Sequence, residues 1–146
     1  MCARDASKRS TARGVRLPSA LDEAIQREAD ARGSSWSSLT TELLDEAIRQ
    51  RRAPGIVFVD GATGRRAVVA GTGIEVWEIV GTWKALTEDF ESTREAYGWL
   101  SEIQLRAALG YYARYPEEVD QRLAREAAWT PERLRDELPY AAPRRE

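Results

Sequence analysis

Histidine is absent from this sequence of 146 residues, and there is a single cysteine. Without histidine, serine–histidine and cysteine–histidine catalysis, histidine general bases and histidine metal sites are all excluded. The lone Cys2 excludes an internal disulfide and a thiolate zinc cluster, and it agrees with a reducing cytoplasm. We therefore expect no catalytic residue, no metal site, no cofactor and no enzymatic activity.

Long apolar runs are missing too. The sequence contains no stretch of about 18 apolar residues, so it predicts no membrane-spanning helix and no membrane partner. The first ten residues lack the apolar core of a secretory signal, which favours a cytoplasmic protein. What is present is enough to build folded cores: 42% of the residues are hydrophobic, among them five tryptophans and five tyrosines.

Charge is nearly balanced overall, with 22 basic and 24 acidic residues, but it is uneven along the chain. The first 18 residues contain one acidic side chain, Asp5, and these basic ones: Arg4, Lys8, Arg9, Arg13 and Arg16. A basic arm on a near-neutral body favours contact with a polyanion, and an ordinary solvated terminus is the alternative. We expect residues 1–10 to form a flexible basic arm.

A single short strand is predicted near the start of the chain. Val15 and Leu17 alternate with a glycine and an arginine, as in a half-buried strand, and Pro18 ends it. An unpaired strand edge is unfavourable, so this strand needs a partner. Either a second copy of the chain supplies the partner across a two-fold axis, or the strand pairs with a hairpin at 56–69 in a monomeric sheet.

Two helices are predicted after the strand, over residues 19–32 and 35–52. Ser19 is expected to cap the first helix and Gly33 to end it, and each helix carries an apolar stripe. One strand and two helices in about 45 residues rarely bury enough surface to fold alone, which favours a dimer. The residues expected in the shared core are Val15, Leu17, Leu21, Ile25, Leu39 and Leu43.

The motif Val15-Arg16-Leu17-Pro18, followed by Gly33-x-Ser35-x-Ser37-x-Leu39-x-x-Glu42, falls within residues 11–50. It resembles the ribbon-helix-helix family of repressors. The resemblance implies an intertwined dimer whose two-stranded ribbon lies in the major groove of double-stranded operator DNA.

The resemblance also implies which ribbon residues meet the DNA. Ala12, Gly14 and Arg16 would face the bases, but the first two have no side chain that can hydrogen-bond a base edge. Arg13 occupies an inward position where the family usually has an apolar residue. Arg16 is therefore the expected base-reading residue, through a bidentate contact to guanine.

By the same comparison, Ser35 and Ser37 would hold a DNA phosphate at the N-terminus of the second helix. Capping of that helix is the alternative role for these serines. The DNA-binding residues expected in this half of the chain are Lys8, Arg9, Arg13, Gly14, Arg16, Ser35 and Ser37.

A hairpin and a series of helices are predicted after the domain boundary at residues 53–55. Two strand-like runs around a glycine-containing turn predict a β-hairpin over 56–69. Helices are expected over 76–86, 92–99, 101–114, 116–128 and 130–138. The fold class is therefore mainly α with short β elements (α+β). The expected domains are 1–10, 11–53, 54–128 and 129–146.

Three segments of the second half form a further pattern. They are Gly71-Thr72-Gly73, then Gln104-x-x-Ala107-Ala108-Leu109-x-Tyr111-Tyr112, then Tyr115-Pro116-Glu117-Glu118. Together they resemble the bacterial domain of unknown function 433, over about residues 56–125. That domain occurs in antitoxins of type II toxin–antitoxin pairs, including the VapB class.

The second resemblance implies a helix-turn-helix-like pair, with the hairpin as a wing. The helix before Trp99 and the helix from Ser101 would form the pair. Gln104 and Arg106 on the second helix are then further DNA-binding candidates. The alternative is a helical module that packs on its neighbours or on a protein partner.

Taken together, these features predict a homodimeric DNA-binding antitoxin and autorepressor. The part after the ribbon-helix-helix domain would neutralise a cognate toxin, a PIN-like ribonuclease as the resemblance implies. Trp129, Leu134 and Leu138 form an amphipathic segment that either packs back on its own domain or docks on that partner. Two alternatives stay open: a stand-alone ribbon-helix-helix transcriptional regulator, and a protein-binding adaptor without DNA binding.

Overall fold

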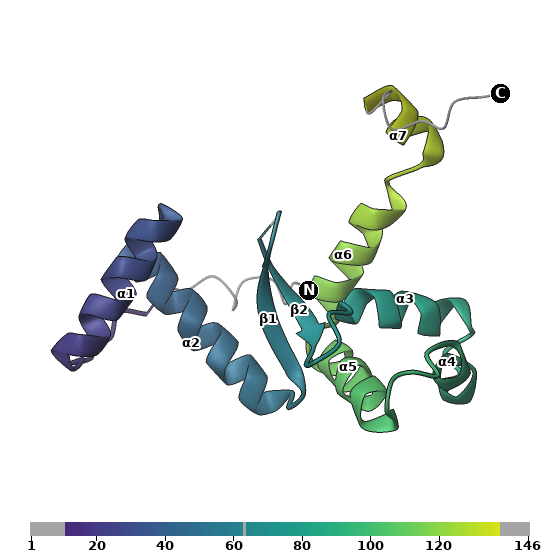
Figure 1. Ribbon diagram of the computed structural model, residues 1–146, viewed down its shortest axis with the longest axis horizontal. Coiled ribbons are helices and arrows are strands. Elements are labelled where there is room, and N and C mark those ends of the chain that lie inside the picture. Colours follow the sequence, from purple (N-terminus) through teal and green to yellow (C-terminus); the bar gives the residue numbers. More distant parts are fainter. Residues whose placement is uncertain (1–10, 63, 138–146) are drawn as a thin grey trace, which may run out of the picture. The chain divides into compact units, whose positions relative to one another are not determined.

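The computed structural model describes residues 11–62 and 64–137 and divides into two compact units (Figure 1). The first unit ends at Asp45 and the second begins at Glu46, inside a helix. Seven helices and one two-stranded antiparallel sheet lie in the described ranges, which confirms a fold that is mainly α with short β elements. The predicted basic arm, with Lys8 and Arg9, lies outside those ranges.

The first unit begins with an irregular segment, residues 11–18, which precedes two helices. Helix α1 covers Ser19–Arg32, and helix α2, Trp36–Arg52, starts in this unit. Gly33 ends α1 as predicted, in the left-handed conformation (φ 63°), which glycine adopts without steric penalty. The prediction that Ser19 caps α1 is wrong: Pro18 occupies the N-cap position, and Ser19 is the first helical residue.

The strand predicted before α1 is not formed in the single chain. Residues 11–18 belong to no strand, and the sheet found in the described residues contains only β1 and β2 of the hairpin. A strand exists through hydrogen bonds to a neighbouring strand, and no stretch of the described chain offers them to this segment. The monomeric alternative, in which the segment joins the hairpin, is therefore not the arrangement observed.

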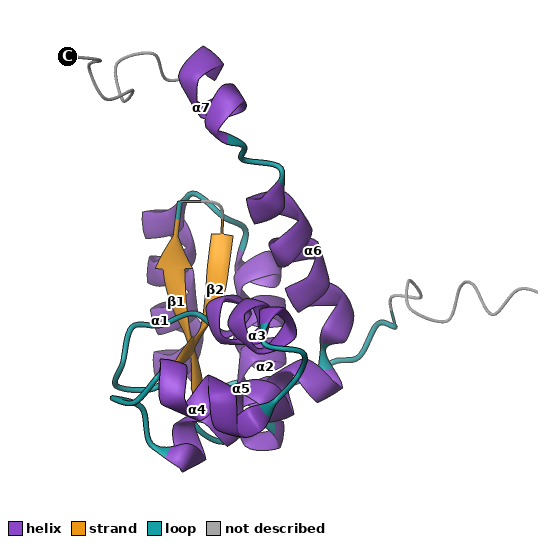
Figure 2. Ribbon diagram, turned by 90° about the vertical axis from the view of Figure 1, so that its right-hand side faces the viewer, coloured by secondary structure: helices purple, strands orange, loops and turns teal. Residues whose placement is uncertain are grey.

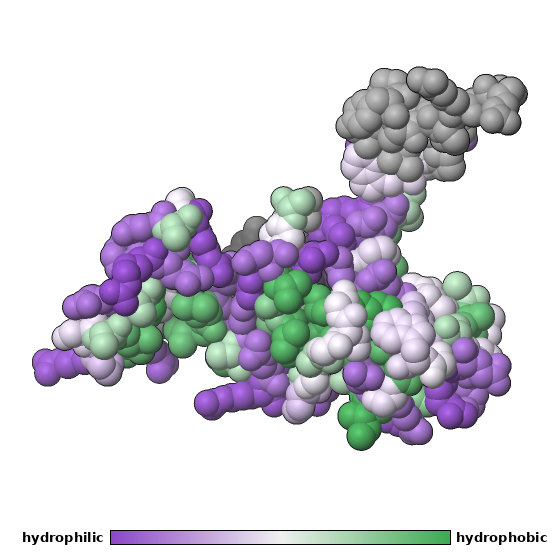
Figure 3. All heavy atoms as spheres, in the orientation of Figure 1, coloured by the Kyte–Doolittle hydropathy of each residue, from purple (hydrophilic) through white to green (hydrophobic). Residues whose placement is uncertain are grey.

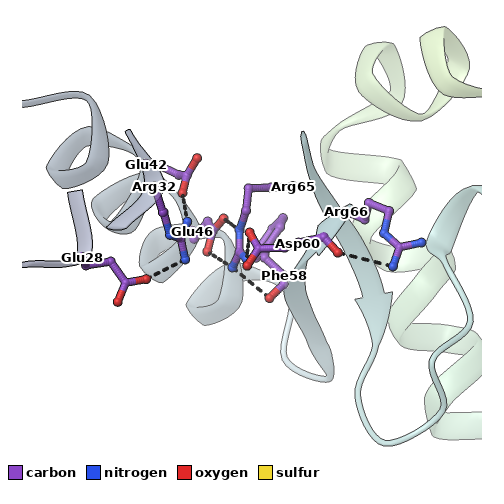
Figure 4. A network of polar contacts seen from close by, with 8 residues as sticks. All are labelled: Glu28, Arg32, Glu42, Glu46, Phe58, Asp60, Arg65 and Arg66. Carbon is purple, nitrogen blue, oxygen red and sulfur yellow. Dashed lines mark hydrogen bonds and ion pairs between the residues drawn. The ribbon is translucent and has the colours of Figure 1, made fainter. Parts of the chain in front are cut away.

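The core of the first unit is small. Ile25, Ala29 and Leu39 are buried together, and Leu17 and Trp36 pack against them while staying partly exposed. At the surface, a network of charges links α1 to α2 (Figure 4): Arg32 contacts Glu28 at 2.7 Å and Glu42 at 3.1 Å. Exposed ion pairs of this kind add little stability, so this unit depends on few buried groups.

The second unit starts with the last turns of α2 and the predicted hairpin. Strand β1, Ile56–Gly61, pairs antiparallel with β2, Gly64–Val69, and Ile56 lies opposite Val69. The helices that follow are α3 (Val76–Ala85), α4 (Phe90–Ala96), α5 (Glu102–Arg114), α6 (Pro116–Ala127) and α7 (Pro131–Glu137). All five lie where the sequence predicts helices, within a few residues at each end.

Local hydrogen bonds explain several of these helix starts. Glu75 and Glu78 form a capping box at the start of α3, and Ser101 and Gln104 form another at the start of α5. The Asp89 carboxylate accepts a hydrogen bond from the backbone N–H of Ser92 at 2.7 Å and so caps α4.

Helix α3 lies at the centre of the second unit. It packs against α4, α5 and α6, and the hairpin packs on α5 and α3 (Figure 2). The buried apolar residues of this core are Ala53, Ile56, Val69, Val76, Ile79, Val80, Leu100, Leu105, Ala108, Tyr111 and Val119. Hydrophobic residues also reach the surface, as Figure 3 shows. Trp99 and Ile103 are 63% and 81% exposed.

Candidate nucleic-acid interface

The basic segment before α1 is accessible in the single chain. Arg13 and Arg16 are both exposed. At Gly14, a Cβ atom built on the backbone would meet nothing within 4 Å, so a ligand can approach the main chain there. Arg13, Gly14 and Arg16, which are near neighbours in the sequence, thus lie on one accessible stretch of the single chain.

Two apolar side chains of the same segment differ in burial. Leu17 packs on the buried trio of Ile25, Ala29 and Leu39, whereas Val15 is 77% exposed. An open groove of about 270 Å³ lies beside them, and its lining includes Trp36 as well as Val15 and Leu17. The inward orientation predicted for Leu17 agrees with this packing, and the described residues leave Val15 largely uncovered.

The residues expected in a shared dimer core divide into two groups. Ile25 and Leu39 are 8% and 2% exposed, so both are buried within one chain. Leu21 and Leu43 are 48% and 40% exposed, as is the neighbouring Leu44 at 61%. Part of the predicted core is therefore solvent-accessible surface when the chain is alone.

The N-terminus of α2 is capped by a serine. The Ser35 Oγ accepts a hydrogen bond from the Ser38 backbone N–H at 3.1 Å and lies 2.9 Å from the Ser38 hydroxyl. The Ser37 side chain is exposed on the first turn of the helix. The capping alternative for Ser35 is thus realised, while Ser37 and the exposed end of the helix stay accessible to an anion.

The two DNA-binding candidates of the second unit both lie on α5 and already have partners. Gln104 accepts a hydrogen bond from the Ser101 backbone N–H at 2.9 Å. Arg106 pairs with Glu102 at 2.7 Å, and its guanidinium lies 4.5 Å from the centre of the Phe90 ring. A contact from α5 to DNA would have to compete with these internal interactions.

A charge cluster that the sequence analysis missed joins the end of α2 to the hairpin (Figure 4). Arg65 donates two hydrogen bonds to Glu46, at 2.6 and 2.9 Å, and one each to Asp60 and the Phe58 carbonyl oxygen at 2.9 Å. The hydrogen bonds to Glu46 are the main reason that the pKa of Arg65 is raised. This pairing explains why the unit boundary falls inside α2 and before the predicted boundary at 53–55.

A second network surrounds the buried Tyr111. Its hydroxyl accepts a hydrogen bond from Arg49 at 2.9 Å and donates one to Glu118 at 2.7 Å, and Arg49 also pairs with Glu118. Burial and the hydrogen bond to Glu118 raise the pKa of Tyr111 above its ordinary value. The phenol therefore stays protonated, and the network fastens α5 and α6 to the end of α2.

The predicted partner-binding segment is described only in part. Trp129 is 43% exposed, and Arg133 lies over its ring at 4.8 Å. The side chain of Leu134 and the whole of Leu138 lie outside what the structure describes. Trp129 is thus accessible to a partner.

Within the described ranges, no cluster of three or more cysteine and acidic residues is arranged to hold a metal ion. None of the helices described there combines the length and the apolar character that a membrane crossing requires. Comparison with protein-family models, with curated proteins and with solved structures yields no significant match to this chain.

Proposed function

We propose that the chain is a homodimeric DNA-binding antitoxin and autorepressor of a type II toxin–antitoxin pair. The first unit would dimerise and bind double-stranded operator DNA, and the second would bind and neutralise a toxin, a PIN-like ribonuclease by the resemblance. One observation carries the proposal furthest. Among the residues that the structure describes, the first unit has a core of three buried apolar side chains beside exposed apolar ones.

The uncovered surface is suited to a second copy of the chain. Leu21, Leu43 and Leu44 are 40% to 61% exposed, and Val15 borders the open groove beside Leu17. Covering such side chains contributes roughly 25 cal/mol for each Å² removed from water. A second copy would also supply backbone partners to residues 11–18, which pair with no strand in the described chain. One second copy would thus cover the exposed apolar side chains and supply hydrogen-bond partners to the unpaired backbone.

DNA binding is supported by where the charges of the first unit lie. Arg13 and Arg16 are exposed on the segment that would form the ribbon, and the start of α2 presents the positive end of its helix dipole. A two-fold dimer doubles both features along one surface. Arginine can then hold a phosphate or form a bidentate contact with guanine.

Toxin binding is supported by the separation of the second unit and by its accessible aromatic and apolar side chains. Trp99, Ile103 and Trp129 are 63%, 81% and 43% exposed. Tryptophan is enriched at protein interfaces, where it contributes large contact areas. This role rests mainly on the resemblance to the antitoxin-associated domain.

The DNA-binding part is tested by gel shift with the full chain and a duplex from the region upstream of its own gene. If the ribbon and the α2 termini contact about six phosphates, log affinity should fall with log salt concentration with a slope near −5. Arg27 on α1 lies outside the proposed interface, so Arg27→Ala is the matched control and should retain the slope. The absence of a shift at 50 mM salt would contradict DNA binding.

The toxin part requires a separate test. The product of the reading frame adjacent to this gene should arrest growth when expressed alone and should be harmless when co-expressed with the full chain. If the neighbouring product is harmless alone while the gel shift is positive, the protein is a stand-alone ribbon-helix-helix regulator.

One observation favours a second candidate, a protein-binding adaptor without DNA binding. Two of the three positions that would face the bases, Ala12 and Gly14, carry no hydrogen-bonding side chain. The adaptor and the repressor share the dimer and differ in the gel shift, which only the repressor gives.

A further inference from the structure

A cavity of about 70 Å³ lies in the second unit between β2, the start of α3, and α6. It can hold several water molecules or a small ion, since one water needs roughly 10–15 Å³ of this kind of space. The charged side chains that line it are Arg65, Arg66, Arg122, Arg125, Glu75 and Glu118. Arg65 is already bonded to Glu46, Asp60 and the Phe58 carbonyl oxygen, which leaves Arg66, Arg122 and Arg125 as the candidate ligand-binding cations of this cavity.

The carboxylates of the cavity are held by other groups. Glu75 accepts a hydrogen bond from Arg66 at 2.8 Å and one from the indole N–H of Trp77 at 2.8 Å. Glu118 accepts the hydrogen bonds of Arg49 and Tyr111. Glu75 is thus shared between Arg66 and Trp77 and lies 3.9 Å from Arg122, while Glu118 is bonded to groups outside the cavity lining.

Several of those donors have no acceptor among the residues described. The Nε atoms of Arg66 and Arg122 are buried, and the described chain offers neither a hydrogen-bond partner. Arg125 lines the cavity from α6, and no ion pair of Arg125 occurs within the described ranges. A buried donor without an acceptor is unfavourable, so an additional acceptor, either an anion or a water molecule, would stabilise these two Nε–H groups.

Arg122 is held in place in a way that suits a binding residue. Its guanidinium lies 5.4 Å from the centre of the Trp77 ring, and it pairs with Glu126 at 3.0 Å. Its distance to Glu75 is 3.9 Å, at the limit of an ion pair. Stacking on the ring restrains the side chain and leaves further N–H donors for a ligand.

From these contacts we infer that the cavity is an anion site that takes a phosphate group, bound by Arg66, Arg122 and Arg125. Arginine forks match the oxygens of phosphate, and these three side chains have more N–H donors than Glu75 and Glu126 occupy within the described ranges. The phosphate group is either free inorganic phosphate or part of a nucleic-acid backbone. This site is independent of the ribbon of the first unit and of its dimer.

The test uses the indole N–H of Trp77 as a reporter, because it lies in the cavity lining and is bonded to Glu75. In the ¹H–¹⁵N spectrum of the full chain, this indole signal is the one lost in Trp77→Phe. Titration with inorganic phosphate at constant ionic strength should change the chemical shift of this signal, and the change should saturate as the phosphate concentration rises. Arg125→Gln, at an exposed position of α6, should weaken phosphate binding about tenfold with the fold unchanged.

Arg94→Gln is the matched control, because Arg94 pairs with Glu91 on α4 and does not line the cavity; it should bind phosphate as the unchanged protein does. A duplex that moves the Trp77 signal in the same direction would identify a backbone phosphate as the source. A response to inorganic phosphate alone would identify the free anion. The inference is overturned if phosphate gives no saturating shift, if chloride gives the same shift, or if Arg125→Gln binds unchanged.

Discussion

The two units of this chain differ in how much of their apolar surface they bury for themselves. Among the described residues, the second unit encloses eleven buried apolar residues around α3, whereas the first encloses Ile25, Ala29 and Leu39. Both units leave apolar side chains exposed, such as Val15 at 77% in the first and Ile103 at 81% in the second, so the difference lies in the size of the core. The second unit is therefore stabilised by its own core, while the small core of the first unit is the reason that we propose a second copy of the chain as its partner.

The largest expected effect concerns the core of the second unit. Ile79 is fully buried in α3, so Ile79→Ala should lower the free energy of unfolding by about 2–5 kcal/mol. Urea unfolding followed by circular dichroism measures the change. The matched control is Ile103→Ala, because Ile103 is 81% exposed and its truncation should change stability by less than about 0.5 kcal/mol. Equal effects of the two variants would contradict the described core.

The next effect separates the first unit from the second. Leu43→Asp places a charge on the surface that a second copy would cover, which should weaken the dimer by about 3 kcal/mol, or more than about a hundredfold. The unfolding of the second unit should not change. Sedimentation velocity across a concentration series measures this, with Thr41→Asp, an exposed polar position of α2, as the control. If Leu43→Asp sediments like the unchanged protein, this face is not the dimer interface.

A smaller effect distinguishes the two arginines of the predicted ribbon. Arg16→Ala should cost about 1–3 kcal/mol of binding to the operator and little with scrambled DNA, because Arg16 would contact a base. Arg13→Ala should weaken both duplexes alike, because Arg13 would contact phosphate. Gel shifts of both variants with both duplexes at one salt concentration measure these differences in affinity. If the unchanged protein binds operator and scrambled duplex equally, Arg16 reads no base.

The smallest expected effect is a pH dependence at the start of α4. Hydrogen bonds from the backbone and side chain of Ser92 lower the pKa of Asp89 below its ordinary value. The stability that these bonds give is therefore present above the unfolded-state pKa of about 3.9 and is lost as the pH falls through the lower folded pKa. Asp89→Asn should be slightly less stable than the unchanged protein at pH 7, with no difference at pH 2. Thermal unfolding at both pH values checks this, and a constant difference would contradict it.

The helices and the hairpin could be predicted from the sequence because their determinants are local. Gly33 ends α1, the capping serine Ser101 starts α5, and Pro116 stands in the first turn of α6. The spacing of apolar residues predicted the remaining bounds of the helices and strands. The predicted ranges differ from the observed ones by only a few residues. Ser19 is the exception, because Pro18 takes the cap position that a serine usually occupies.

What could not be predicted depends on contacts between distant parts of the chain. A strand at residues 11–18 requires a partner strand, which the described part of one chain does not provide. The unit boundary inside α2 follows from the pairing of Glu46 with Arg65, which are far apart in the sequence. The cavity lined by Arg66 and Arg122 arises only when α6 packs beside β2, and isolated arginines gave no indication of it.

The central claim is that the first unit is completed by a second copy of the chain. Multi-angle light scattering of the full chain at micromolar concentration tests it directly. If the chain is a dimer, the measured mass should be about twice the 16.4 kDa of one chain. A mass of 16.4 kDa that does not change as the concentration rises would contradict it.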